Sequence, residues 1–336
     1  MDALRISTAV IGTLIYIAGF IGNFFASLLF VQKELRQVST GLLFLLLTIT
    51  NTIHLLSLIF EFIDSLFVIQ IFPFDVFRCQ FILWLQNATR TICSFLATTV
   101  SIDRFLRSEY LMLSRRWCTP KNVCKLSIIY LLFSILLYSF FFYPSNTFDN
   151  EGFCTFDFNG TFRILAVYVM PPIRFTLICI IPTVIMVACG CRMVYNVGQS
   201  RKRVTQQTIT HNQTLATIVV PILQSTNTTN NDRRQNIASD RVLLSMVIIN
   251  IIAYIITQLP FNSYAVYYGY ETTKNSLSYS LTRSFLLIWS SVYFGVGFYL
   301  FCCASRQFRK QFLIKIKIIN ILRHSSQRRM SLTRNT

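Results

Sequence analysis

Residues 79–105 read CQFILWLQNATRTICSFLATTVSIDRF, and this stretch decides the fold. A helix rises about 1.5 Å per residue, so the step from Cys79 to Asp103 covers about 36 Å. That length crosses the hydrocarbon core of a bilayer. The spacing therefore predicts a membrane-spanning helix with a thiol at one membrane face and the charged pair Asp103–Arg104 at the other.

The composition is that of a membrane protein. Hydrophobic residues make up 53% of the chain, charged residues 13%, and the mean hydropathy is +0.52, which excludes an ordinary soluble globular protein. Backbone polar groups in lipid must be satisfied within their own segment, and the sequence has no alternating pattern of a membrane barrel. The sequence therefore predicts an all-α membrane protein, a seven-transmembrane helix bundle with spans at about 8–31, 42–63, 76–105, 126–143, 171–195, 241–264 and 284–303.

The net charge of +18 is distributed as a topology signal. With the N-terminus outside, 24 of the 31 Lys and Arg residues lie on the cytoplasmic side, in 32–41, 104–125, 192–241 and 303–336. The outer loops carry acidic residues instead, which is the positive-inside pattern. We therefore expect the basic surface to face membrane lipids rather than nucleic acid. The predicted location is the plasma membrane, multi-pass, with the C-terminus in the cytoplasm.

The segments outside the spans at each end are predicted to be short. The first apolar stretch is longer than the core of a signal peptide and no small-residue cleavage site follows it, so we interpret it as a signal anchor behind an extracellular tail of residues 1–7. After the last span, apolar residues alternate with bases. This pattern predicts a short amphipathic eighth helix at 304–322 and a disordered cytoplasmic tail at 323–336. Cys302 and Cys303 suit either palmitoylation or burial.

Two of the ten cysteines fall on the outer side of the membrane. Cys79 lies at the start of the third span, and Cys154 lies in the loop between the fourth and fifth spans. Disulfides persist in this compartment, so a Cys79–Cys154 bond would hold that loop over the third helix. Two free thiols are the alternative.

Several short motifs occur in a fixed order along the seven segments. They are Gly22–Asn23 in the first span, Asp103–Arg104–Phe105 ending the third, Pro182 in the fifth, Pro260 in the sixth and Phe308–Arg309 after the seventh. With the spacing from Cys79 to Arg104, this set resembles the rhodopsin-like (class A) family of G-protein-coupled receptors over about residues 1–322. The resemblance implies an extracellular ligand, a heterotrimeric G protein as partner, and helix kinks at the two prolines. It also implies that Asp103, Arg104 and Phe105 belong to the coupling switch.

The chain departs from the family's pattern near the middle of the membrane. Asn51 stands where the family usually has an aspartate, and Gly297–Phe298 replaces an Asn–Pro pair. Both changes remove charge or polarity from the site that binds sodium in many relatives, so we expect weak or absent sodium regulation. Gln258 replaces the usual aromatic residue before Pro260. The GFYLF segment of the seventh span is similar to that of divergent invertebrate receptors, including peptide-receptor-like ones.

Asp240 is a candidate partner for Arg104. It lies twenty residues before Pro260, about 30 Å along a helix, at the cytoplasmic end of the sixth span. An Arg104–Asp240 pair would hold the inactive state closed, and its opening would expose Arg104 to a G protein. Asp103 alone could also restrain Arg104, and Asp240 could equally be a solvated residue at a helix start.

Arg90 is a charge near the middle of the third span. Helical steps from Arg104 place Arg90 and Gln86 on the face that looks into the bundle. A charge at this depth costs about 2.5–3.5 kcal/mol on insertion scales and usually has a function. Arg90 could anchor a ligand carboxylate or amide carbonyl, or it could form a buried ion pair with Glu61. Arg174, at the outer end of the fifth span, could contact ligand or extend to the surface.

The candidate ligand-binding residues are therefore Glu61, Gln86, Arg90, Arg174, Gln258 and Tyr264. Gln86 occupies the position where aminergic relatives place an aspartate, and 284–303 lacks the lysine that binds retinal in opsins, so the resemblance disfavours monoamines and light. Tyr264 begins a tyrosine cluster at the outer end of the sixth span. Such a cluster suits a short basic or amidated peptide, but also the ordinary anchoring of a helix end. We expect a peptide or a small polar molecule as ligand.

Two motifs predict covalent modification. Asn159 begins the sequon Asn159–Gly160–Thr161 in an outer loop, where glycosylation occurs. Ser331 follows Arg328–Arg329–Met330, a pattern similar to basophilic kinase sites. A phosphate there would subtract charge from the membrane-facing tail.

Other classes of protein fit the sequence less well. A multi-helix transporter or ion channel is the alternative, although transporters often carry inverted repeats and this chain shows no internal repeat. The histidines His54, His211 and His324 are scattered, so no metal site is expected. No P-loop or nucleophile elbow indicates an enzyme, and we expect no cofactor.

Overall fold

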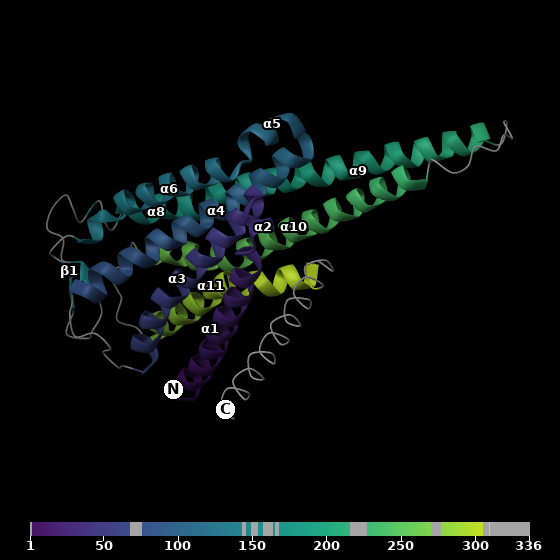
Figure 1. Cartoon of the computed structure of the whole chain (residues 1–336). Helices are drawn as coiled ribbons and strands as arrows, with labels where there is room; N and C mark the ends of the chain where they lie inside the picture. The colour runs from purple at the N-terminus through teal and green to yellow at the C-terminus, as the bar shows by residue number, and fades with distance from the viewer. Residues whose placement is uncertain are drawn as a thin grey trace, which may run out of the picture.

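The computed structural model describes residues 2–67, 76–142, 146–148, 154–156, 164, 168–215, 227–269, 277–304 and 309. These residues form a bundle of long helices (Figure 1). The long helices are α1 (Asp2–Phe30), α3 (Ser39–Phe67), α4 (Leu83–Glu109), α6 (Pro120–Leu137), α9 (Ile181–Leu215), α10 (Asn227–Gly269) and α11 (Leu277–Ala304). The predicted helical bundle is confirmed, whereas the eighth helix falls almost wholly outside the described residues.

Shorter elements connect the long helices. They are α2 (Lys33–Arg36), α5 (Leu111–Trp117), α8 (Met170–Phe175), the 3-10 turn η2 (Ser139–Phe142), and the π-helical segments η1 (Val76–Ile82) and η4 (Thr176–Ile180). The start of α6 has clear capping signals, because the side chain of Thr119 accepts a hydrogen bond from the backbone N–H of Asn122 and Pro120 occupies the first turn.

Six of the described helices contain a stretch that is long and apolar enough to cross a membrane. These stretches are Ile6–Phe30, Ser39–Phe60, Pro120–Leu137, Met170–Asn196, Val247–Tyr267 and Thr282–Cys303. The helix α4 is not among them, because amides, hydroxyls and Arg90 interrupt its apolar residues. However, 16 of its 27 residues are buried, and α3, α6 and α9 pack around it. Protein rather than lipid surrounds these polar groups, so α4 can be the central helix of a membrane bundle.

The helices α9 and α10 are longer than the spans predicted for them. α9 continues to Leu215 and α10 begins at Asn227, and the two contact each other and extend beyond the rest of the bundle (Figure 1). Their extensions are rich in polar residues, and two of the most frequent, Thr and Asn, are weak helix formers. A helix that has already been nucleated within the bundle propagates into such residues at little cost.

A small hairpin covers one end of the bundle. Strand β1 (Asn146–Phe148) pairs antiparallel with β2 (Cys154–Phe156), with Phe148 opposite Cys154. β1 also lies beside η1, the segment that contains Cys79. The side chains of Cys79 and Cys154 lie outside the described part of the chain, so the disulfide stays a prediction that this backbone arrangement favours.

Helices α1 and α11 approach each other closely at two glycines. A Cβ atom on Gly295 would lie 2.7 Å from the Cα of Gly19, which is closer than real side chains pack. Asn23 adds a hydrogen bond from its Nδ2 to the backbone oxygen of Phe294, at 3.0 Å. Small residues at such a crossing allow backbone contact, which is how membrane helices associate without a hydrophobic driving force.

Gly295→Ala should therefore destabilise the folded protein by about 1–3 kcal/mol, the usual cost of overpacking. The matched control is Gly297→Ala one half-turn away, where an added Cβ meets nothing within 4 Å. Thermal unfolding of the purified protein and surface expression measure both. Equal stability of the two variants would contradict the backbone contact between α1 and α11.

Candidate functional site

A polar cluster lies between α4, α10 and α11. The guanidinium of Arg90 is buried, stands 4.4 Å from the ring centre of Phe261, and donates to the hydroxyl of Ser290 at 3.5 Å. Gln258 is fully buried and donates from Nε2 to the backbone oxygen of the same Ser290, at 2.8 Å. Ser290 of α11 is therefore bonded both by Arg90 of α4 and by Gln258 of α10. Both of these partners are predicted ligand-binding residues.

Two more of the predicted ligand-binding residues connect helices. Gln86 is buried and donates to the backbone oxygen of Ser57 at 3.1 Å, which joins α4 to α3. Arg174 does not simply extend to the surface, since its Nη1 donates to Oδ1 of Asn87 at 2.9 Å. Tyr264 lies half-buried in α10. The side chain of Glu61 lies outside the described residues, so its pairing with Arg90 stays open.

The proline of α9 frees a carbonyl that neighbouring helices use. Pro182 has no N–H to donate to the oxygen of Ile178 four residues earlier. The hydroxyl of Ser94 in α4 donates to this oxygen at 2.7 Å, and the hydroxyl of Tyr254 in α10 also bonds to it. The two hydroxyls lie 2.7 Å apart. A single backbone oxygen therefore ties α10 to α4 and to the end of η4.

The proline of α10 frees a second carbonyl in the same way. Pro260 cannot donate to the oxygen of Ile256, and the indole Nε1 of Trp289 in α11 donates to it instead, at 2.9 Å. Together with the bond from Gln258 to Ser290, this gives α10 two direct ties to α11 within one turn of its kink.

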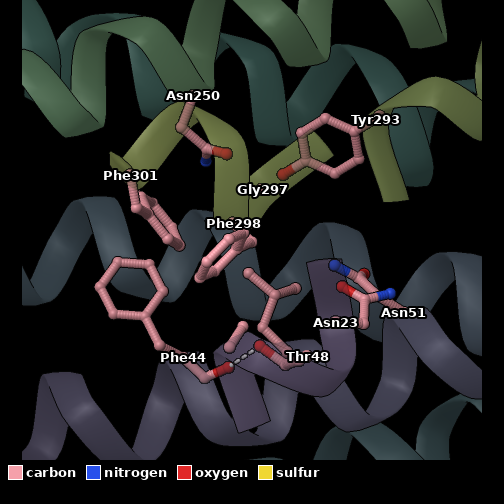
Figure 2. A pocket seen from close by; sticks show the side chains of 11 residues that line it. Asn23, Phe44, Thr48, Asn51, Asn250, Tyr293, Gly297, Phe298 and Phe301 are labelled. Atoms are coloured by element: carbon pink, nitrogen blue, oxygen red, sulfur yellow. Dashed lines mark hydrogen bonds between the residues drawn. The ribbon is translucent and has the colours of Figure 1, made fainter. Parts of the chain in front are cut away.

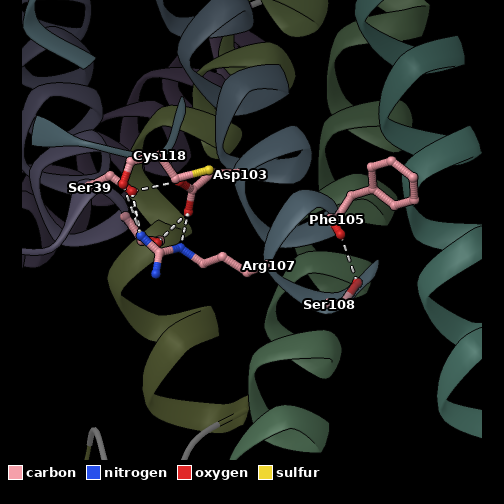
Figure 3. A network of polar contacts seen from close by, with 7 residues as sticks. Ser39, Asp103, Phe105, Arg107, Ser108 and Cys118 are labelled. Atoms are coloured by element: carbon pink, nitrogen blue, oxygen red, sulfur yellow. Dashed lines mark hydrogen bonds and ion pairs between the residues drawn. The ribbon is translucent and has the colours of Figure 1, made fainter. Parts of the chain in front are cut away.

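At the other end of α4, Asp103 is the centre of a hydrogen-bonded network (Figure 3). Its carboxylate accepts from the hydroxyls of Ser39, at 2.5 Å, and Thr40, and it pairs with Nε of Arg107 at 3.2 Å. Arg107 also donates to the Ser39 hydroxyl and to the backbone oxygen of Cys118. The network joins the start of α3, the end of α4 and the segment before α6.

The thiol of Cys118 completes this network. Burial, reinforced by the negative charge of Asp103 and a hydrogen bond to it, raises the pKa of Cys118 to about 12. At neutral pH the thiol is therefore protonated and donates to the carboxylate. It acts as a structural contact and not as a reactive nucleophile.

A small cavity lies where α1, α3, α10 and α11 meet (Figure 2). It is lined by Asn23, Ala26, Phe44, Leu47, Thr48, Asn51, Asn250, Tyr293, Gly297, Phe298 and Phe301, and its volume is about 10 Å³. That volume is about the minimum for one water molecule. Oδ1 of Asn51 is buried with no partner within the described part of the chain. None of the lining residues carries a charge, which favours water over a sodium ion.

Comparison with known proteins agrees with this arrangement. The family model described as 7 transmembrane receptor (rhodopsin family) matches residues 22–294, well over half of the chain. The chain belongs to the rhodopsin family of seven-transmembrane receptors. The family suggested by the sequence motifs is confirmed.

Two curated proteins that are similar to this receptor come from a virus and from a fish. A G-protein coupled receptor homolog of fowlpox virus (strain NVSL) is 26% identical over 186 residues, which are 54% of this chain and 57% of that protein. A somatostatin-like receptor of Takifugu rubripes is 25% identical over 114 residues, 34% of this chain and 39% of that protein. The match thus spans about half the length of these curated relatives, or less.

The remaining motif residues predicted for the coupling switch lie next to the Asp103 network. Arg104 and Phe105 follow Asp103 and are half-buried, and the ring of Phe105 contacts that of Tyr110 with centres 6.0 Å apart. Asp240 is in α10, but its side chain lies outside the described residues, as do Asn159, Ser331 and the cysteine pair.

The described residues contain no group of three or more His, Cys, Asp or Glu that could hold a metal ion.

Sequence reasoning missed several residues of the receptor's polar networks. Arg107 could have been found, because it lies four residues after Asp103 and therefore on the same helix face. Ser39, Thr40 and Cys118 come from distant segments, and nothing in their spacing points to Asp103. The freed carbonyls of Ile178 and Ile256 follow from the prolines, but their partners Tyr254 and Trp289 do not.

The Asp103 network predicts a pH-dependent thiol reactivity. Cys118 should react slowly with iodoacetamide near about pH 8, and the rate should rise about tenfold per pH unit, as the thiolate fraction does below a pKa. Asp103→Asn removes the negative charge that raises the pKa of Cys118, so alkylation near about pH 8 should speed up. Peptide mass spectrometry measures the rate, with Ser108→Ala on the same helix as control. A rate that Asp103→Asn leaves unchanged would exclude the carboxylate contact.

Proposed function

We propose that the protein is a plasma-membrane receptor that couples an extracellular ligand to a cytoplasmic heterotrimeric G protein. In this proposal the N-terminus is outside, the C-terminus is in the cytoplasm, and the ligand is a short peptide or a small polar molecule. Membership of the rhodopsin family supports the receptor function. The observation that carries the mechanism is the pair of carbonyls freed by Pro182 and Pro260 and bonded by neighbouring helices.

These bonds make the position of α10 switchable. Within the described part of the chain, hydrogen bonds of Tyr254, Trp289 and Gln258 tie α10 to its neighbours. Each contributes about 0.5–1.5 kcal/mol, which is small enough for a ligand to offset. Moving α10 outward breaks the ties, so a ligand that prefers the open arrangement shifts the population toward it.

The inner end of the bundle would supply the coupling surface. The Asp103 network fixes the end of α4 against α3 and the Cys118 segment, which makes it a stable base for Arg104. We retain Arg104–Asp240 as the pair that closes the inactive state. The basic inner segments, which would face lipid headgroups and the G protein, agree with this orientation.

The proposed ligand class follows from one relative and from the buried polar side chains of the bundle. One relative is named as a somatostatin-like receptor, which favours a peptide. The polar residues Arg90 and Gln258 suit a ligand with hydrogen-bonding groups. A Cys79–Cys154 disulfide would hold the hairpin above this region, and Asn159 would carry a glycan on the same side. Ser331 would be a phosphorylation site in the cytoplasmic tail.

Tyr254→Phe and Trp289→Phe should each raise ligand-independent signalling about two- to tenfold, because each removes one tie that holds α10 closed. Nucleotide exchange on purified G proteins, in vesicles with equal receptor content, measures the effect. The matched control is Tyr130→Phe, since the hydroxyl of Tyr130 bonds Thr99 and joins α6 to α4 without involving α10. Wild-type exchange in both variants would remove the freed carbonyls from the mechanism.

Asp240→Ala should also raise ligand-independent exchange, at matched surface expression, if Asp240 restrains Arg104 in the closed state. Asp232→Ala, about two turns nearer the start of α10, controls for the loss of one negative charge. Should both variants keep the basal level of the wild type, Asp240 would be no more than a solvated helix residue.

A further inference from the structure

We infer that α5 and the start of α6 form a binding surface for anionic lipids, in the membrane leaflet at this end of the bundle. This role is separate from signalling, because it requires only that the chain lies in a bilayer. Three large apolar side chains of α5 point to it. Met112, Leu113 and Trp117 are 79%, 44% and 63% exposed. Apolar side chains that are grouped and exposed in this way mark a contact surface.

The exposed apolar side chains of α5 share one face of the helix with a base. Met112 lies four residues before Arg116, so these two side chains are neighbours on the helix surface. The same spacing joins Leu113 to Trp117. Ser114, on the other side of the helix, is buried. A face that combines apolar side chains with a guanidinium is typical of a helix that lies in a membrane interface.

Neighbouring segments hold α5 in this orientation. Nδ2 of Asn122 donates to the backbone oxygens of Arg116, at 3.3 Å, and Trp117, at 3.0 Å. Arg107 of α4 donates to the backbone oxygen of Cys118, the next residue. These bonds satisfy carbonyls at the end of α5 that have no partner within the helix. The apolar face is therefore presented outward by a fixed backbone.

The basic residues around this face are not neutralised by the chain itself. They are all exposed: Arg115, Arg116, Lys121 and Lys125. Residues 110–125 contain no Asp or Glu. Of the acids near the end of α4, Asp103 pairs with Arg107 at 3.2 Å. Glu109 pairs with Arg192 at 3.5 Å. The four bases form no ion pair in the described part of the chain, so a negatively charged partner complements them.

The position of the surface favours a membrane over a protein as this partner. Trp117 lies three residues before Pro120, where a helix apolar enough to cross a bilayer begins. Tryptophan is enriched at this level of a membrane, and bases there lie among the headgroups. Figure 1 shows α5 at the outer edge of the bundle, away from α1 and α11. The apolar side chains then enter the interface, and the bases bind anionic headgroups.

The short helix α2 provides the contrast. Its apolar residue, Leu35, packs against the core, whereas Lys33 and Arg36 are exposed. The sequence also places an acid, Glu34, between these bases. α2 therefore has exposed basic residues without the apolar face and the acid-free surroundings of α5, which makes it the matched control.

Fluorescence locates Trp117 in the full-length receptor, reconstituted in phosphatidylcholine bilayers. The signal of Trp117 is the difference between the wild type and Trp117→Phe. We expect lipid that is brominated near the headgroup to quench at least about half of this signal, because the indole lies in the interface. Acrylamide dissolved in the water should leave the same signal almost unchanged.

Thermal unfolding in a neutral detergent measures the headgroup preference. Short-chain phosphatidylserine should raise the midpoint as its concentration rises, since it binds the folded receptor, whereas phosphatidylcholine of equal chain length should not. The double variant Arg115→Gln/Arg116→Gln should weaken the apparent affinity for phosphatidylserine about tenfold. The control Lys33→Gln/Arg36→Gln removes the same charge from α2 and should change that affinity less than about twofold.

Three outcomes would overturn the inference. One is a Trp117 signal that acrylamide quenches and brominated lipid does not. Another is an equal loss of phosphatidylserine affinity in the two double variants, which would mean that only the general basic charge attracts lipid. The third is a Trp117 signal that becomes shielded only when purified G protein is added, because the surface would then be a protein contact.

Discussion

A proline in a membrane helix leaves one carbonyl without its donor, and in lipid no water replaces that donor. The bundle solves this problem twice with side chains from adjacent helices. Ser94 and Tyr254 satisfy the carbonyl of Ile178, and Trp289 satisfies that of Ile256. Each proline position therefore depends on the adjacent helices for the donor that its freed carbonyl requires. Helix α10 takes part in both sets of bonds, because its Tyr254 donates to the carbonyl of Ile178 and its Ile256 carbonyl accepts from Trp289. The position of α10 therefore depends on both bonds.

This dependence also explains why the central helix is polar. α4 contributes Ser94 to the freed carbonyl, Gln86 to the backbone of α3, and Asn87 to Arg174. Each of these side chains would be costly against lipid but is satisfied against protein. Polarity in α4 thus reflects its place in the bundle. The outward-facing helix α6 shows the opposite pattern, with mostly apolar exposed residues and only Val123 and Ser134 buried.

The class of fold could be predicted from the sequence, because a series of apolar segments long enough to cross a bilayer indicates a bundle of membrane-spanning helices. It also placed Arg90 on the helix face that looks into the bundle, where Arg90 is buried, and singled out Asp103 at a membrane face. It could not name their partners, since Asp103 meets Ser39 across 64 positions and Arg90 meets Ser290 across 200. Helical periodicity reveals contacts within one helix, such as Asp103 with Arg107. Contacts between helices depend on their rotation and depth, which hydropathy does not specify. The polar extensions of α9 and α10 were missed because composition predicts loops where an existing helix can continue.

The strength of the ties limits how the switch can work. If the ties of Tyr254, Trp289 and Gln258 contribute about 0.5–1.5 kcal/mol each, they amount to about 1.5–4.5 kcal/mol, whereas moving a population from almost fully closed to almost fully open takes about 5.5 kcal/mol of differential binding. The ties alone therefore allow a measurable open population without ligand, and a strongly silent receptor needs a further restraint. The middle of the bundle offers only neutral groups around its cavity, including Asn23, Asn51 and Tyr293. Charge contributes to this restraint at one described place, since Arg90 of α4 stands over the ring of Phe261 in α10, and the proposed Arg104–Asp240 pair would add a second charged contact between the same two helices.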